Sequence, residues 1–141
     1  EDFDAVFNIN VKGLFFLTQE VSKMMNDGGR IINISSGITV ARVLGSSIYA
    51  GSKAAIEAFT RSWAAELGSR NITVNTVSPG MTKTEMLMEV VPEAARESAV
   101  QSTPLGRLGD PQDIADAVAL LCSEEARWIT AQNVRVNGGF E

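Results

Sequence analysis

The sequence predicts an α/β domain with a parallel sheet of three strands flanked by helices. Stretches with apolar residues spaced by three or four alternate along the chain with short, nearly continuous apolar runs. Such runs are typical of parallel strands buried on both faces, and their alternation with helices favours a parallel sheet. No repeat, low-complexity tract or internal linker interrupts this order, so we expect residues 1–141 to belong to one domain.

Turn and capping residues mark where the predicted elements begin and end. Gly28 follows the first helical stretch, and Pro79 with Gly80 stops a central strand. Asp110 before Pro111 is typical of a helix start. The expected order is a helix over 3–25, a strand over 30–35, a loop over 36–48, a helix over 49–68, a strand over 72–78, a mixed segment over 85–102, a helix over 110–121 and a strand over 133–137.

Composition and charge narrow the class of protein. A net charge of −5 argues against nucleic acid and anionic membranes as partners, because both favour clustered Lys and Arg. No apolar run approaches the ~20 residues that a membrane helix needs, and the first residues show no signal-peptide pattern. The one cysteine, Cys122, excludes an internal disulfide. We therefore expect a cytoplasmic protein.

The residue types that are missing exclude several chemistries. The chain has no histidine, so Ser-His-Asp and Cys-His nucleophile systems are excluded. With a single cysteine, the usual zinc sites are excluded as well, and we expect no metal. Any acid/base catalysis must therefore come from Tyr, Lys, Asp or Glu.

Tyr49 and Lys53 are the first candidates for that chemistry. They are four positions apart at the start of a predicted helix, so their side chains share one face. A free tyrosine has a pKa near ~10, and a neighbouring ammonium group favours the phenolate by Coulomb attraction. Such a pair can donate a proton to a carbonyl oxygen. The same spacing also fits an aromatic residue followed by a solvated lysine without a catalytic role.

Ser36 and Asn10 are two further candidates. Ser36 follows a predicted buried strand, at the edge where ligands of open α/β sheets bind. A serine that merely ends a strand is an equally ordinary reading. Asn10 falls inside the apolar stripe of the first helix, where a buried amide needs hydrogen-bond partners. It is either a structural anchor or part of the site.

Together, Asn10, Ser36, Tyr49 and Lys53 resemble the catalytic tetrad of the short-chain dehydrogenase/reductase family. The segment N-T-V-S-P-G at 75–80 is similar to a strand end of that family. Thr84 stands at the position where the family has a threonine that faces the nicotinamide. Three later segments resemble the closing part of that family. They are P-L-G-R at 104–107, I-T at 129–130 and V-N-G-G at 136–139. The resemblance covers essentially the whole chain and is greatest to the 3-oxoacyl-acyl-carrier-protein reductase type.

This resemblance implies an NAD(P)-dependent oxidoreductase that interconverts a carbonyl and a secondary alcohol by hydride transfer. Tyr49 would donate the proton to the substrate oxygen, and Lys53 would favour that transfer and hold the nicotinamide ribose. Ser36 would hydrogen-bond the substrate oxygen, and Asn10 would hold a water that relays protons. A small carbonyl or alcohol substrate and a homodimer or homotetramer are further implications.

The resemblance also assigns residues to the cofactor, which would be NAD or NADP. Besides Tyr49 and Lys53, these residues lie after the second predicted strand and are Pro79, Gly80, Thr82 and Thr84. The residue that selects between NAD and NADP belongs to the family's glycine-rich first part, which has no counterpart in these 141 residues. The choice between the two cofactors therefore stays open.

We accordingly expect the carboxyl-terminal, catalytic part of a Rossmann-like doubly wound domain, without its amino-terminal βαβ units. About a hundred residues would be lacking, at ~30 residues for each unit, and the isolated chain would be inactive. The alternative is a non-enzymatic fragment or interaction module that uses the family's dimer-forming helices. The presence of all four tetrad residues favours the enzyme.

The segment over 85–103 is expected to roof the substrate pocket, because it is the longest stretch between a strand end and the next clear helix. Its apolar side chains suit an adaptable lid. They are Met86, Leu87, Met88, Val90 and Val91.

Overall fold

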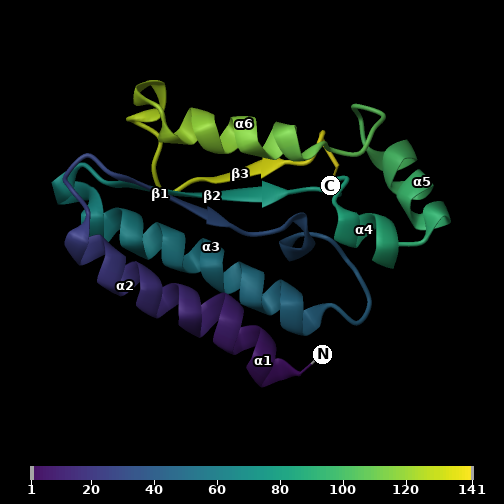
Figure 1. Ribbon diagram of the computed structural model, residues 1–141, viewed down its shortest axis with the longest axis horizontal. Coiled ribbons are helices and arrows are strands. Elements are labelled where there is room, and N and C mark those ends of the chain that lie inside the picture. The colour runs from purple at the N-terminus through teal and green to yellow at the C-terminus, as the bar shows by residue number, and fades with distance from the viewer. Residues whose placement is uncertain (1, 141) are drawn as a thin grey trace.

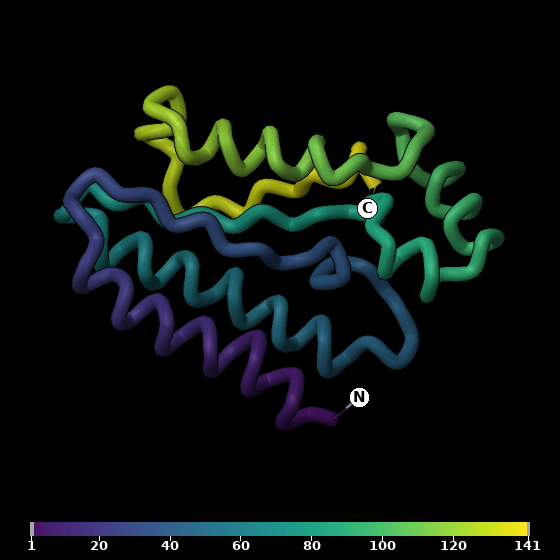
Figure 2. Tube along the Cα trace, viewed as in Figure 1, coloured from purple at the N-terminus to yellow at the C-terminus, as the bar shows by residue number. Residues whose placement is uncertain are grey.

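Three parallel strands form the middle layer of the structure, a computed structural model that describes residues 2–140 (Figures 1 and 2). They are β1 (Arg30–Ile34), β2 (Thr73–Pro79) and β3 (Asn133–Val136), in the spatial order β1-β2-β3. The register places Asn33 beside Thr76 and Val77 beside Val134. The predicted α/β class with a three-stranded parallel sheet is confirmed.

Helices cover both faces of this sheet (Figure 1). On one face lies α3 (Ser47–Leu67), with the amino-terminal helical segment beside it, and on the other lies α6 (Pro111–Cys122). The start of α6 has the predicted cap, because the Asp113 carboxylate accepts a hydrogen bond from the Asp110 backbone N–H at 2.7 Å and Pro111 occupies the first turn. Short 3₁₀ turns lie at Gly37–Thr39, Gly68–Arg70 and Glu124–Ala126.

The core is divided between the two faces of the sheet. Trp63 of α3 and Val74 of β2 belong to one buried cluster, against which Phe59 packs. Val77 of β2 and Leu121 of α6 belong to the other. Because β2 lies between both clusters, every residue from Thr73 to Ser78 is buried. Burial of apolar side chains on both faces of this strand fixes the position of its carboxyl end.

The first helix is not the single regular helix predicted over 3–25. It consists of α1 (Phe3–Phe7), a π-helical segment (Asn8–Gly13) and α2 (Leu14–Met24). A π-helical turn contains an extra residue, so it shifts the phase of the apolar stripe. Within α2, Leu17 and Met24 are 62% and 84% exposed.

Other boundaries differ by smaller amounts. The mixed segment over 85–102 contains two helices, α4 (Glu85–Val90) and α5 (Glu93–Ser102). Pro92 separates them, because a proline lacks the N–H of a helical turn and disfavours helical geometry in the residue before it. Val91 accordingly has extended backbone. Helix α3 begins two residues earlier than predicted, at Ser47, and β1 ends one residue earlier, at Ile34. No helix among the described residues is long and apolar enough to cross a membrane.

Candidate active site

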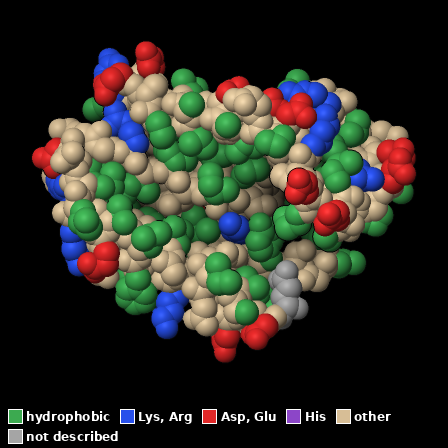
Figure 3. Space-filling model, viewed as in Figure 1, with side chains coloured by type: hydrophobic (Ala, Val, Ile, Leu, Met, Phe, Trp, Pro, Cys, Tyr) green, Lys and Arg blue, Asp and Glu red, His purple; other side chains and the backbone are tan. Residues whose placement is uncertain are grey.

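A cavity of about 1030 Å³ opens where the carboxyl ends of β1 and β2 meet the start of α3. Ser36, Tyr49 and Lys53 all line it, so the structure brings together three of the four predicted catalytic residues. Hydrophobic side chains gather around the hollow to the right of centre in Figure 3. The carboxyl edge of a parallel sheet is where ligands of open α/β folds bind.

Tyr49 and Lys53 lie on one face of α3, as their spacing predicts. The Lys53 ammonium nitrogen is 5.7 Å from the centroid of the Tyr49 ring, and it donates a hydrogen bond of 3.0 Å to the backbone oxygen of Ile34. Partial burial removes water from this nitrogen and lowers the pKa of Lys53 below its usual value. A cation is thus held between the end of β1 and the aromatic ring.

Ser36 lies two residues after the end of β1, where its hydroxyl oxygen accepts a hydrogen bond of 3.2 Å from the backbone N–H of Ile38. The hydroxyl hydrogen remains able to donate into the cavity. Ser35, the preceding residue, is buried, and its hydroxyl donates to Glu57 of α3 at 2.9 Å. This contact fixes the strand end against the helix that carries Lys53.

Asn10 lies behind the cavity rather than on its wall. Its side-chain amide, held in the π-helical segment, donates a hydrogen bond of 3.1 Å to the hydroxyl of Ser52. Ser52 is fully buried and donates in turn to the backbone oxygen of Tyr49 at 2.8 Å. Sequence reasoning missed Ser52, although a serine next to Lys53 on a helix face of small residues was a signal for it.

The other residues predicted to contact the cofactor line the same cavity. Pro79, Gly80, Thr82 and Thr84 all line it. A side chain at Gly80 would come within 2.8 Å of Asn137, so the close approach of these two segments requires glycine there. The Thr84 hydroxyl oxygen caps α4 by accepting from the N–H of Leu87 at 3.2 Å.

Arg107 and Asp113 line the cavity and are a further pair of residues that sequence reasoning missed. The two guanidinium nitrogens of Arg107 lie 2.6 and 2.8 Å from the two carboxylate oxygens of Asp113. This bidentate contact, with a further bond from the backbone N–H of Asp110, holds the pKa of the Asp113 carboxyl well below its usual range. The pair joins the loop before α6 to the first turn of that helix.

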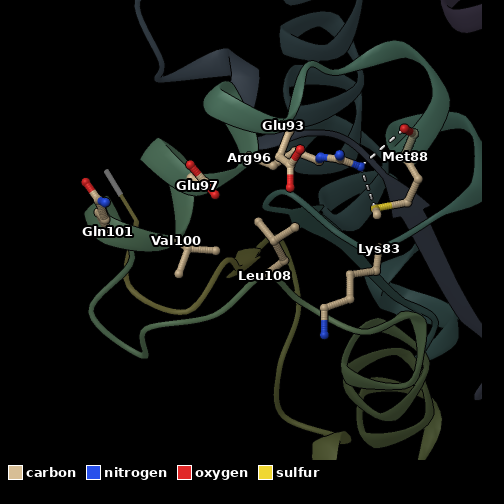
Figure 4. Close-up of a pocket in the computed structure, with 8 residues that line it drawn as sticks. All are labelled: Lys83, Met88, Glu93, Arg96, Glu97, Val100, Gln101 and Leu108. Carbon is tan, nitrogen blue, oxygen red and sulfur yellow. Dashed lines mark hydrogen bonds between the residues drawn. The ribbon is translucent and has the colours of Figure 1, made fainter.

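A second hollow lies between α4, α5 and the segment before α6 (Figure 4). It is an open groove of about 530 Å³. Arg96 is held there by the backbone oxygen and the sulfur of Met88, each at 3.2 Å. Lys83 pairs with Asp110 at 3.1 Å. The groove contains none of the residues predicted to be catalytic, so the larger cavity is the candidate active site.

Fold and site together define an α/β protein with a ligand cavity at the carboxyl ends of its parallel strands. The family model described as Enoyl-(Acyl carrier protein) reductase matches residues 1–141. The 3-oxoacyl-[acyl-carrier-protein] reductases FabG of Thermotoga maritima and Rickettsia conorii are 43% and 47% identical to 99% of the chain. The chain belongs to the short-chain dehydrogenase/reductase family.

Solved structures agree with this membership. A double mutant of a Serratia marcescens short-chain dehydrogenase/reductase superposes with a TM-score of 0.89 at 40% identity, covering 99% of this chain and 56% of that chain. The angucycline C-6 ketoreductase LanV with bound NADP has the same TM-score and identity, over 97% of this chain and 53% of its own. The chain likewise spans 57% and 58% of the two FabG proteins.

Proposed function

We propose that the protein is an NAD(P)-dependent oxidoreductase that interconverts a carbonyl and a secondary alcohol, and that it acts as a 3-oxoacyl-acyl-carrier-protein reductase or a close relative. The observation that carries this proposal is that Ser36, Tyr49 and Lys53 line the same cavity as Pro79, Gly80, Thr82 and Thr84. The names of the FabG relatives and of the NADP-bound ketoreductase support it.

The donors around the cavity fit the nicotinamide end of NAD or NADP. The Lys53 ammonium can donate to ribose hydroxyls, and the Thr84 hydroxyl, which only accepts at present, can donate to a carboxamide oxygen. When bound, the cofactor supplies or takes the hydride. With Pro79, Gly80 and Thr82 at the same wall, these residues would fix which face of the nicotinamide meets the substrate.

In the direction of reduction, Tyr49 and Ser36 would act on the substrate oxygen. The Tyr49 hydroxyl, which has no hydrogen-bond partner among the described residues, would donate its proton as the oxygen becomes an alkoxide. Ser36 would donate a hydrogen bond to the same oxygen and hold it in line. Lys53, fixed near the Tyr49 ring, would stabilise the phenolate that proton transfer leaves.

Asn10 would act one step further from the substrate. Its side-chain nitrogen is bound to Ser52, while its side-chain oxygen has no partner among the described residues. That oxygen is free to hold a water, through which Lys53 could exchange protons with solvent. We propose this relay as the role of Asn10.

The assembly is proposed to be a homodimer or homotetramer. Helix α2 exposes the large apolar side chains of Phe16, Leu17 and Met24 to solvent. Contiguous exposed apolar surface of this kind is typical of protein interfaces. The same surface is the observation that favours the second candidate function, a non-enzymatic interaction module.

Replacement of Tyr49 by Phe in the full-length gene product tests the proposed reaction. Phe keeps the ring and removes the proton donor, so kcat should fall by at least about 100-fold. The melting temperature should stay unchanged, and Ser47→Ala, an exposed substitution on the same helix, should leave kcat unchanged. A Tyr49→Phe enzyme with more than a few per cent of the wild-type kcat would contradict the role assigned to Tyr49, whereas a wild-type protein without any turnover would favour the interaction module.

A further inference from the structure

Polar side chains join α3 to the end of β1 beside the candidate active site, where the helix lies along the strand (Figure 1). The Ser35 hydroxyl donates to the Glu57 carboxylate at 2.9 Å and lies 3.2 Å from the backbone oxygen of Lys53. Two residues earlier on the strand, the Asn33 amide donates to the hydroxyl of Thr60 at 2.8 Å. Because hydrogen bonds are directional, these contacts fix the position of α3 along β1 more narrowly than apolar contacts would.

Ser35 is held on two sides, immediately before the proposed hydrogen-bond donor Ser36. Its backbone N–H donates to the backbone oxygen of Val77 in β2 at 2.8 Å, and its buried hydroxyl reaches the two acceptors on α3. Consecutive Cα atoms are about 3.8 Å apart across a planar peptide unit. A displacement of Ser35 therefore moves Ser36 as well.

Glu57 supplies the stronger of the two acceptors on α3. It is half-buried, and Ser35 is its one hydrogen-bond or ion-pair partner among the residues that the structure describes. A hydrogen bond to an ionised acceptor is stronger than one between neutral groups, so the carboxylate holds Ser35 more firmly than the backbone oxygen of Lys53 does. Without Glu57, the Ser35 hydroxyl would retain only the longer contact of 3.2 Å.

The helix side of this contact belongs to the same face of α3 as the proposed proton donor. Tyr49, Lys53 and Glu57 follow one another at intervals of four residues, and residues four apart lie on one helix face. The residues that line the cavity include Tyr49 and Lys53 but not Glu57. Glu57 therefore acts on the reaction through the residues that it holds in place and not by contact with a substrate.

We propose that Glu57 is a positioning residue for the reaction, which through Ser35 fixes where the Ser36 hydroxyl lies relative to the Tyr49 hydroxyl. Both hydroxyls have to meet a single substrate oxygen, so this proposal rests on the proposed function. Misplacement of reacting groups by about 1 Å can lower a rate by about 100-fold. Loss of the Ser35–Glu57 contact slows the reaction and leaves the groups that bind substrate and cofactor unchanged.

Two substitutions of Glu57 in the full-length gene product test this role, with acetoacetyl-coenzyme A as the 3-oxoacyl substrate and both NADH and NADPH. Glu57→Met removes the acceptor, so kcat should fall by about tenfold to 100-fold while KM stays within about threefold of wild type. Glu57→Gln keeps an acceptor oxygen and should keep kcat within about threefold. Glu66→Met, at an exposed position of the same helix, should leave kcat unchanged.

The temperature of the assay separates positioning from a loss of stability. All values of kcat are measured well below the melting temperature of each variant, so a substitution that only destabilises the fold leaves kcat at the wild-type value. A wild-type kcat in Glu57→Met would overturn the proposal. Equal losses in Glu57→Met and Glu57→Gln would also overturn it, because the charge and not the hydrogen bond would then matter.

A double-mutant cycle tests whether Glu57 acts through Ser35. Ser35→Ala removes the donor of the same hydrogen bond from the strand side. The double variant Ser35→Ala/Glu57→Met should therefore have the same kcat as Ser35→Ala alone, within about threefold, because residues that act through one contact are not additive. Losses that multiply in the double variant would show that Glu57 acts by another route and would overturn the proposal.

Hydrogen exchange tests the positioning without turnover. A wild-type protein that reduces nothing would contradict the proposed function, whereas exchange in the ligand-free full-length protein still reports on the strand end. The backbone N–H groups of Ser35 and Ile38, on either side of Ser36, are both hydrogen-bonded. They should exchange at least about tenfold faster in Glu57→Met, and at the wild-type rate in Glu57→Gln and Glu66→Met. Unchanged exchange at both groups in Glu57→Met would overturn the proposal.

Discussion

The ammonium nitrogen of Lys53 lies 3.0 Å from the backbone oxygen of Ile34, so one side chain joins the helix that carries Tyr49 to the strand that leads to Ser36. The same nitrogen is 5.7 Å from the centre of the Tyr49 ring. Lys53, which is partly removed from water, thus helps the Ser35–Glu57 contact to hold the proposed proton donor and the proposed hydrogen-bond donor to the substrate in position.

Lys53→Met should change how stability depends on pH. Burial lowers the pKa of Lys53 in the folded chain below the value of 10.5 for a free lysine. Between these two pKa values the unfolded chain binds more protons, so the stability of wild type relative to Lys53→Met should rise with pH across that interval. Denaturant unfolding of both proteins from neutral pH to about pH 11 measures this difference. Lys23→Met, at an exposed position, is the control, and a difference that falls with pH would contradict the prediction.

Ser52→Ala should destabilise the fold through the loss of two hydrogen bonds. Ser52 is fully buried, accepts from Asn10 and donates to the backbone oxygen of Tyr49. Removal of the Ser52 hydroxyl leaves the Asn10 amide and the Tyr49 backbone oxygen without this partner. The free energy of unfolding should fall by about 1–3 kcal/mol. Ser62→Ala, at an exposed position of the same helix, makes the same chemical change and should stay within about 0.5 kcal/mol of wild type. Urea unfolding compares the two, and equal free energies of unfolding would show that the Asn10–Ser52 contact contributes nothing.

Asp113→Asn should be most destabilising at neutral pH and lose its effect in acid. The side-chain bond from Arg107, followed by the backbone bond from Asp110, holds the pKa of Asp113 below its usual value of 3.8. The stabilisation by the carboxylate is therefore fully present above that value and is lost as pH falls toward the folded pKa. Urea unfolding down to about pH 2 measures the difference in free energy of unfolding between wild type and variant. This difference should shrink once the pH is below the usual pKa of the Asp113 carboxyl. Asp116→Asn, which removes only a contact with Gln112 within the helix, is the control.

The family and the three-stranded sheet were predictable because they depend on local patterns. The spacing of Tyr49 and Lys53 placed both side chains on one helix face, and the apolar run before Ser36 placed that residue at a strand end. Both features follow from the helix and strand periods of 3.6 and 2 residues. The predicted positions of these residues around one cavity agree with the structure.

The features of the helices and of the site that were not predicted depend on contacts between distant segments, which a single sequence does not display. The π-helical turn at Asn8–Gly13 adds one residue to a helix whose apolar spacing fits a regular helix equally well. Asn10 meets Ser52 across 42 positions of the chain, and this contact exists only once the two helices pack. The pairing of Arg107 with Asp113 likewise depends on a long-range contact, because Gly109 between them forms an isolated β-bridge with Thr82.

The chain of residues 1–141 by itself should bind NAD or NADP only weakly. It contains no pair of glycines spaced as G-x-G, and so lacks the glycine-rich turn at which a helix start receives a dinucleotide diphosphate. The proposed contacts from Lys53 and from Pro79 to Thr84 reach only the nicotinamide end. We expect a dissociation constant in the millimolar range or weaker, about 4 kcal/mol of binding free energy or less. Calorimetric titration of the purified chain, with its length confirmed by intact mass and the full-length gene product as control, measures it. Micromolar affinity would mean that residues 1–141 already contain a complete site for the cofactor.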